Sequence, residues 1–336
     1  MSTRLRYIDL AKGCAIILML FAHTMTKINY LHIWIYSFHM PIFFIICGIL
    51  IYEKQKNYIF FSKRMVMQRV YMLGIPYLFW GGILVIFYTL LDIIATGSAY
   101  LWKSRIFKLL TLQGIDSLWF IPIYIIAEFI VQAIRNNKWR RILAAVSFIV
   151  VSFGMRNTSN WWIELIYKSL IGICFIQIGI EISRYSVIDK INREKYVLLI
   201  GSSGLALING PVEMSVGSIG NSYIYFWCAT VISVSIMAIL KEIEKKKDKL
   251  LFIIEKYGRN TIVILVTNNL LIEIERLIDY KITDNLLIRM GMLGSIIFTL
   301  VLLIIEWEVI KLANNSFSVV FGKSKKMRHE FRENIV

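Results

Sequence analysis

Long apolar runs recur along the whole chain, and they decide what this sequence can fold into. A membrane-spanning helix needs about 20 predominantly apolar residues, and about ten runs approach that length. Runs of this kind are typical of membrane helices, so we expect an all-α, polytopic membrane protein with about ten transmembrane helices. The runs cover residues 8–26, 33–52, 70–94, 118–134, 140–155, 161–182, 195–210, 222–240, 259–275 and 285–310.

The composition agrees with this expectation. Of the 336 residues, 57% are hydrophobic, whereas soluble domains are about 45–50% apolar. No low-complexity linker or separate soluble segment interrupts the runs, so we expect a single transmembrane domain over residues 1–336. The first run carries Asp9 and Lys12 and lacks a small-x-small cleavage pattern, which argues against a removable signal peptide.

Lysine and arginine are concentrated in alternate connecting segments. By the positive-inside rule, this pattern predicts that both termini are cytoplasmic in a multi-pass protein of the cell membrane. The net charge of +16 therefore reflects orientation and attraction to anionic lipid, and a nucleic-acid partner is not expected. The basic segments include Arg4 and Arg6, residues 54–69, RNNKWRR (135–141), residues 184–195, KEIEKKKDK (241–249) and the tail KSKKMRHEFR (323–332).

One connecting segment departs from the alternation. Residues 95–116 should lie outside, yet they contain Lys103, Arg105 and Lys108. Their apolar residues recur at roughly helical spacing, which is typical of a helix lying in the membrane interface. A basic rim for an anionic acceptor is the functional alternative to a simple headgroup-anchored connection.

The first run contains three ionisable residues: Asp9, Lys12 and His23. Such groups inside a membrane helix each cost about 2.5–3.5 kcal/mol on insertion scales. On a continuous helix, Lys12 and His23 lie on one face, about 16 Å apart along the axis. Asp9 falls within about 40° of that face. An imidazole that titrates near neutral pH suits a general base, although a packing histidine is the alternative for His23.

A second histidine stands before a proline in the second run. Pro41 lies several residues into this run and predicts a kink, while Gly48 permits close approach of another helix. If the second run returns inward, His39 and His23 both lie in the outer half of the bilayer and a two-imidazole pocket becomes possible. The structural alternative is that His39 bonds a backbone carbonyl freed by the proline.

Further polar residues mark the other runs. Arg69 is expected at the cytoplasmic mouth near Lys12, where its planar fork suits phosphate, although it also fits the positive-inside pattern. Glu128 inside an apolar run needs a partner or a proton, and could pair with Lys12 or Arg69 or orient a histidine. Asn268 and Asn269 could line a pocket, but hydrogen bonding between helices is the favoured interpretation.

Four segments together resemble the acyltransferase-3 family of integral membrane enzymes that O-acetylate surface sugars. These segments are RLRYIDLAKGCAIILMLFAH (4–23), FHMPIFFIICG (38–48), RVYMLGIPY (69–77) and LWFIP (118–122). The resemblance implies acetyl-CoA as the cytoplasmic donor and a hydroxyl at the outer face as the acceptor, on a surface glycan or glycolipid.

The resemblance also assigns residues. The family's pattern of a cation and a histidine with ten residues between them falls on Lys12 and His23, and its FHMP histidine falls on His39. Its arginine pair matches Arg69, but Met72 occupies the second position, so Lys63 or Arg64 is a possible substitute. Where members often carry a histidine in the ninth run, this chain has Asn268 and Asn269.

The leading hypothesis is therefore an O-acetyltransferase of cell-surface or cell-wall glycans. In it, Lys12, Arg69, Asp9 and Arg64 hold the donor, with Asp9 orienting Lys12, while His23, His39 and Glu128 form the catalytic group. His23 would act as base or as transient acyl carrier. The alternative is a proton-coupled transporter or flippase for a glycolipid or small anion. No motif for a metal, nucleotide hydrolysis or a serine nucleophile is present in the sequence.

Overall fold

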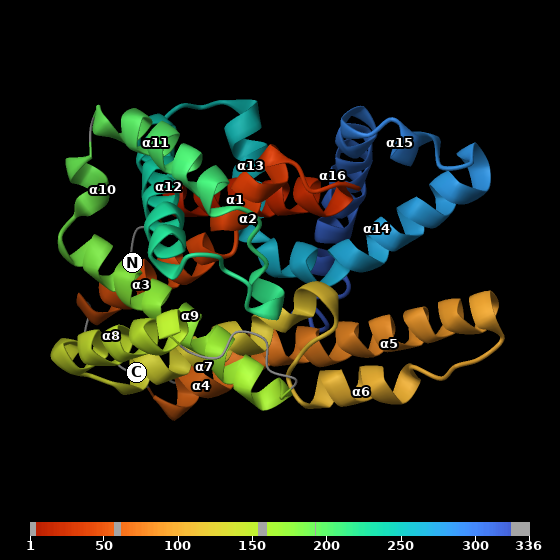
Figure 1. Cartoon of the computed structure of the whole chain (residues 1–336), viewed down its shortest axis with the longest axis horizontal. Coiled ribbons are helices and arrows are strands. Elements are labelled where there is room, and N and C mark those ends of the chain that lie inside the picture. Colours follow the sequence, from red (N-terminus) through yellow and green to blue (C-terminus); the bar gives the residue numbers. More distant parts are fainter. Residues whose placement is uncertain (1–4, 57–61, 154–159, 192, 324–336) are drawn as a thin grey trace. The chain divides into compact units, whose positions relative to one another are not determined.

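The computed structural model describes residues 5–56, 62–153, 160–191 and 193–323. Across these residues the regular structure is helical, apart from one isolated bridge between Glu213 and Ser218 (Figure 1). The expected all-α class is thereby confirmed. The chain forms two compact units: Met1–Phe60 with Ile126–Thr261, and Phe61–Ile125 with Ile262–Val336.

The first unit packs its helices in pairs. α3 lies against α9, α1 against α13, α11 against α12, and α8 against α9. The helices of this unit are α1 (Arg6–Thr24), α2 (Tyr30–Phe38), α3 (Pro41–Lys56), α8 (Asn137–Phe153), α9 (Trp161–Arg184), α10 (Val187–Lys190), α11 (Glu194–Asn209), η3 (Met214–Val216), α12 (Ser222–Ile243) and α13 (Lys249–Arg259). The unit also includes α7 (Phe120–Ala133) from Ile126 onward.

A proline divides the second apolar run into α2 and α3. Proline lacks a backbone N–H and its ring clashes with the carbonyl four residues earlier. The helix accordingly ends at Phe38, turns at His39 and Met40, and restarts with Pro41 as the first residue of α3. The predicted kink is confirmed, and it places His39 at the break.

Two glycines bring α3 and α9 into backbone contact. A Cβ on Gly48 would lie 2.0 Å from the Ile176 carbonyl oxygen, and a Cβ on Gly179 would lie 2.0 Å from that of Ile45. Small residues of this kind allow membrane helices to approach closely. The approach expected at Gly48 is confirmed.

The second unit contains α4 (Lys63–Arg69), η1 (Val70–Gly74), α5 (Ile75–Thr96), α6 (Trp102–Leu110), η2 (Asp116–Trp119), the start of α7, nearly all of α14 (Thr261–Thr283), α15 (Leu286–Arg289) and α16 (Met292–Asn315).

The helix expected within residues 95–116 is α6, which lies along α5. Arg105 pairs with Asp92 through two hydrogen bonds of 2.5 and 3.2 Å, and Tyr77 donates to the Leu109 carbonyl at 2.7 Å. Arg105 is thus engaged within the protein.

A π-helical turn, η1, separates α4 from α5. Pro76 cannot donate to the carbonyl of Met72, which a regular α-helix would require, and the chain widens into a π turn just before it. Such turns are frequent at functional sites. This turn follows Arg69 directly and contains Met72, the position at which the family resemblance expects an arginine.

Seven helices within the described residues are long and apolar enough to cross a membrane. They correspond to the first, second, third, fourth, sixth, eighth and tenth expected runs. The other three runs also form helices, but α8 and α11 are short, and α14 carries Glu273, Glu275 and Arg276. The total of about ten spans and the cytoplasmic position of both termini stay predictions.

Candidate functional site

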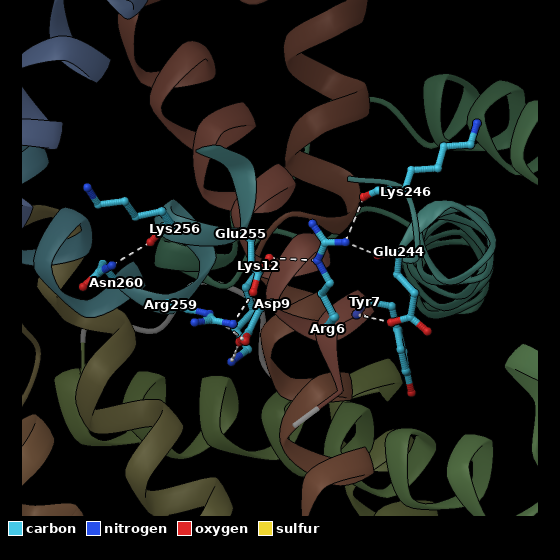
Figure 2. Close-up of polar contacts among 10 residues, drawn as sticks. All are labelled: Arg6, Tyr7, Asp9, Lys12, Glu244, Lys246, Glu255, Lys256, Arg259 and Asn260. Atoms are coloured by element: carbon cyan, nitrogen blue, oxygen red, sulfur yellow. Dashed lines mark hydrogen bonds and ion pairs between the residues drawn. The ribbon is translucent and has the colours of Figure 1, made fainter. Parts of the chain in front are cut away.

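A cluster of charges lies where the first half of α1 meets α13. Five residues form it, and we call them the basic cluster: Arg6, Asp9 and Lys12 from α1, with Glu255 and Arg259 from α13 (Figure 2). Lys12 Nζ lies 3.4 Å from Asp9 Oδ1, and Arg259 Nε lies 3.5 Å from Asp9 Oδ2. One carboxylate therefore holds two cations, one from each helix.

Glu255 is the second carboxylate of the basic cluster and is also shared. Arg6 Nε contacts its Oε2 at 2.8 Å, while Arg259 pairs with its Oε1. Arg6 further donates to the carbonyls of Glu244 and Lys246, at the end of α12 and just beyond it. These contacts fix the start of α1 against both neighbouring segments.

Burial separates the two signs of charge in this cluster. The carboxylate side chains of Asp9 and Glu255 are 4% and 10% exposed, whereas those of Lys12 and Arg259 are 22% and 47% exposed. The acids therefore form the floor and the cations face outward. Three cations against two carboxylates leave a positive surface, which suits an anionic ligand.

The chain holds α13 close to α1 through two glycines. A Cβ on Gly13 would lie 2.0 Å from the Ile254 carbonyl oxygen, and a Cβ on Gly258 would lie 1.7 Å from that of Asp9. Only glycine allows backbones to approach this closely. Gly258 therefore sets the position of the adjacent Arg259.

Neither α13 nor Arg259 was predicted from the sequence. Residues 241–258 were expected to form a connecting segment, and this was wrong, because the short amphipathic helix α13 occupies most of it. Asp248 caps that helix, accepting hydrogen bonds from the amides of Leu250 and Leu251 at 2.7 and 3.4 Å. Aspartate at an N-cap followed by a Glu–Arg pair four residues apart is the signal that could have revealed it.

A second cluster lies at the other end of α1. We call His23, His32, Tyr36 and His39 the imidazole cluster. The Tyr36 ring lies between the histidines, with ring centres 4.0 Å from His32, 4.8 Å from His39 and 6.2 Å from His23. The structure thus brings His23 and His39 to one aromatic side chain, as the two-imidazole expectation required.

His39 has a defined orientation. Its Nδ1 lies 3.0 Å from the Ile35 carbonyl oxygen, and a carbonyl can only accept, so Nδ1 carries the proton and donates. In the neutral ring the lone pair is then on Nε2. The acceptor is not the one that the structural interpretation expected, because the Ile35 carbonyl already accepts from the His39 amide at 3.0 Å, whereas the missing N–H of Pro41 would free the carbonyl of Ser37.

His32 and Tyr36 were absent from the sequence-based site. The second run was expected to begin at residue 33, but α2 begins at Tyr30 because Asn29 caps it, accepting from the His32 amide at 2.9 Å. His32, Tyr36 and His39 then lie on neighbouring turns of one helix and its end. An asparagine followed by an apolar run was the available signal.

The two clusters are connected by a single straight element. Because α1 is continuous from Arg6 to Thr24, Lys12 and His23 are separated by about 16 Å along its axis. The predicted alignment of Asp9, Lys12 and His23 on one helix is therefore borne out in geometry. Their chemical roles stay predictions.

The remaining predicted site residues lie elsewhere. Arg64 and Arg69 belong to α4 in the second unit and are not part of either cluster of the first. Glu128 is buried in α7, and its Oε1 accepts a hydrogen bond from Gln132 Nε2 at 2.7 Å. A role for Glu128 in orienting a histidine stays a prediction.

In the second unit, the paired asparagines of α14 hold a neighbouring segment. Ser117 Oγ lies 3.1 Å from Asn268 Oδ1 and 3.2 Å from Asn269 Oδ1, and Asn268 Nδ2 donates to the carbonyls of Ile264 and Leu265. These contacts agree with the favoured interpretation of hydrogen bonding between segments.

Comparison with known proteins identifies the family of this chain. A family model described as an acyltransferase domain, that of the acyltransferase-3 family, matches residues 5–307. No curated protein and no solved structure matches the chain. The matched range contains the basic cluster and the imidazole cluster.

Proposed function

Since this chain belongs to the acyltransferase-3 family and is a membrane acyltransferase, we propose that it transfers an acetyl group from acetyl-CoA to a surface glycan. The donor would be cytoplasmic, and the acceptor would be a hydroxyl of a cell-surface or cell-wall glycan or glycolipid. The observation that carries the proposal is the layout of α1. This helix bears the partly exposed cations Arg6 and Lys12 at one end and His23, beside the imidazole cluster, at the other.

The basic cluster supports binding of the donor. Coenzyme A is anionic at its nucleotide end, and Lys12 and Arg259 present two partly exposed cations over a buried carboxylate. Charge-assisted hydrogen bonds to phosphate are stronger than neutral ones, and arginine donates two in parallel. The positive-inside pattern predicts that this end of α1 lies on the cytoplasmic side, where acetyl-CoA is found. Arg69 and Arg64, both on α4, are proposed to add further donor contacts.

The length of α1 supports delivery of the acetyl group. The phosphates and the thioester of acetyl-CoA are joined by a long, thin pantetheine arm. With the phosphates at Lys12, that arm would extend about 16 Å along α1 toward His23. The thioester would then lie near the imidazole cluster, which we expect to face the acceptor side of the membrane.

His23 is proposed as the reacting base, with His39 and Tyr36 beside it. In direct transfer, His23 takes the proton of the acceptor hydroxyl as its oxygen attacks the thioester carbon. The carbon–sulfur bond breaks, and the imidazolium returns the proton to the departing thiolate. In the alternative route, the imidazole attacks the thioester carbon, the carbon–sulfur bond breaks, and the thiolate leaves with the imidazole proton. The hydroxyl oxygen then attacks this acetyl group, the carbon–nitrogen bond breaks, and the imidazole takes up the hydroxyl proton. Both routes need a neutral imidazole at position 23.

The test uses acetyl-CoA labelled in the acetyl group. It is supplied to envelope membranes to which the purified protein has been added. Acyl transfer consumes the thioester, releases a thiol and moves label into the glycan or glycolipid fraction. His23→Ala should lower both signals by at least about 100-fold, the usual contribution of a positioned base. Lys27→Ala, an exposed residue just beyond α1, is the control.

Two results would reject the proposal. Full activity of folded His23→Ala would exclude His23 as base or acyl carrier. Wild-type protein that neither releases thiol nor moves label, yet carries a glycolipid or anion across the membrane, would identify a transporter.

A further inference from the structure

A cavity of about 360 Å³ lies in the first unit, separate from both clusters. The end of α3, the start of α8, the end of α9 and the segment before α8 surround it. Three of its lining residues are arginines and none is acidic. The lining comprises Tyr52, Gln55, Arg135, Asn137, Arg140, Ile180 and Arg184, which we call the arginine pocket.

Arg140 forms the buried part of the arginine pocket. It is 2% exposed, and its Nε donates to the carbonyls of Val131 and Ile134, while Nη1 donates to Gln55 Oε1 at 3.0 Å. Its Nη2 is buried and has no hydrogen-bond partner among the described residues. Burying a guanidinium without a charged partner is unfavourable, so the burial of Arg140 beside this cavity favours an anion nearby.

The other two arginines are at the rim of the arginine pocket. Arg135 and Arg184 are exposed, and the Arg184 guanidinium lies over the Tyr52 ring at 6.0 Å from its centre. This stacking holds the cation beside the cavity. Asn137, the first residue of α8, adds the positive end of a long helix.

Nearby carboxylates have other partners. Glu181 Oε1 accepts from Asn137 at 3.0 Å and from Gln177 at 2.6 Å, and Arg141 binds Glu181 through both oxygens. Glu53 accepts from Ser183 at 2.7 Å. None of the lining residues is acidic, although Glu181 interacts electrostatically with Arg184 from beside the arginine pocket.

We propose that the arginine pocket binds a phosphate group at the cytoplasmic face of the membrane. Arginine forks match the oxygens of phosphate, and three of them line this cavity. The alternation of basic segments predicts that all three arginines lie on the cytoplasmic side, where anionic lipid headgroups and phosphorylated solutes both occur. The pocket shares no residue with the basic cluster, so the proposal holds whether or not that cluster binds acetyl-CoA.

The test measures ligand affinity by thermal-shift titration of detergent-purified protein in phosphate-free buffer. The lipid probe is dioctanoyl phosphatidylglycerol, with dioctanoylglycerol as the matched lipid lacking phosphate. The solute probes are inorganic phosphate and coenzyme A. Binding to the folded protein alone raises its melting temperature, and the concentration dependence gives the dissociation constant.

Arg184→Ala is the main variant because this residue is exposed and its loss should leave the fold intact. Arg140→Gln tests the floor of the pocket, and Arg193→Ala removes an exposed charge at the start of α11 without touching the pocket. At least one phosphate-bearing probe should bind about tenfold more weakly to Arg184→Ala and Arg140→Gln than to wild type and Arg193→Ala. Dioctanoylglycerol should not bind, and His23→Ala should bind the phosphate probes normally.

The probes then identify the source of the phosphate. Binding of the phospholipid without the solutes identifies a lipid headgroup, and the reverse identifies a phosphorylated solute. The proposal is overturned if no phosphate-bearing probe shifts the wild type. It is also overturned if Arg184→Ala binds as tightly as wild type, or if Arg193→Ala weakens binding equally, since bulk charge would then explain the effect.

Discussion

Arg259 Nε lies 3.5 Å from Asp9 Oδ2, so the last residue of α13 joins the first turn of α1. Lys12 occupies the other oxygen of the same carboxylate, at 3.4 Å. One buried aspartate therefore holds two cations side by side, facing out of the protein. The family resemblance expects an arginine at the position of Met72. Arg259 supplies a planar guanidinium at a different place in the chain.

The first prediction concerns donor affinity. Arg259→Ala and Lys12→Ala should each raise the Michaelis constant for acetyl-CoA about tenfold or more and change kcat little. Each removes a charge-assisted contact, which contributes about 1.5–3 kcal/mol. Initial rates over a range of acetyl-CoA concentrations give both constants.

The matched control for this prediction is Lys256→Ala. Lys256 belongs to the same helix, but its ammonium points away from the basic cluster (Figure 2). An effect of Lys256→Ala as large as that of Arg259→Ala would show that general positive charge, and not the basic cluster, attracts the donor.

The second prediction concerns the contact between α1 and α13. Gly258→Ala places a methyl group 1.7 Å from the Asp9 carbonyl oxygen, so the two helices must separate. We expect a lower melting temperature and weaker donor binding, because Arg259 moves with its neighbour. Differential scanning fluorimetry in detergent, together with the acetyl-CoA titration, measures both effects.

Gly201 provides the control for Gly258. It lies within α11, and nothing lies within 4 Å of a Cβ built there. Alanine has a higher helix propensity than glycine by about 1 kcal/mol, so Gly201→Ala should be neutral or slightly stabilising. If both variants behave alike, the glycine contact has no special importance.

The third prediction concerns Asp9 itself. Asp9→Asn keeps the shape but removes the charge that separates Lys12 from Arg259, so like charges then face one another. We expect a loss of about 1.5–3 kcal/mol of stability, the contribution of hydrogen bonds to a charged group. Asp189→Asn is the comparison, because its ion pair with Lys241 is exposed, with side chains 58% and 34% exposed, and should change stability by less than about 1 kcal/mol. Equal melting temperatures for Asp9→Asn and wild type would contradict this prediction.

The sequence predicted correctly those features that depend on a single helix. The alignment of Lys12 and His23 follows from helical repeat alone, because α1 has no break between them. The break at His39 follows from the chemistry of Pro41. Neither inference needed to know which other helix lies nearby.

The sequence did not reveal which residues meet across the fold. Arg259 reaches Asp9 only because Gly13 and Gly258 let two distant helices touch, and no local pattern encodes that pairing. His32 was missed for a smaller reason, since the start of α2 was placed a few residues too late. Interhelical neighbours are a tertiary property, whereas periodicity reports only one helix at a time.

The last prediction separates the two interpretations of His39. Its Nδ1 donates to the Ile35 carbonyl, and its Nε2 carries the lone pair of the neutral ring. The side-chain amide of asparagine can replace the Nδ1 donor but has no basic nitrogen. His39→Asn should therefore keep the melting temperature near that of wild type and lower kcat by about 100-fold or more, if Nε2 takes part in proton transfer.

His39→Ala is the control. It loses both the Nδ1 donor and the basic Nε2, so it should lower stability as well. An active His39→Asn variant beside a destabilised His39→Ala variant would assign His39 a structural role at the break between α2 and α3, and would leave His23 as the base on which the chemistry depends.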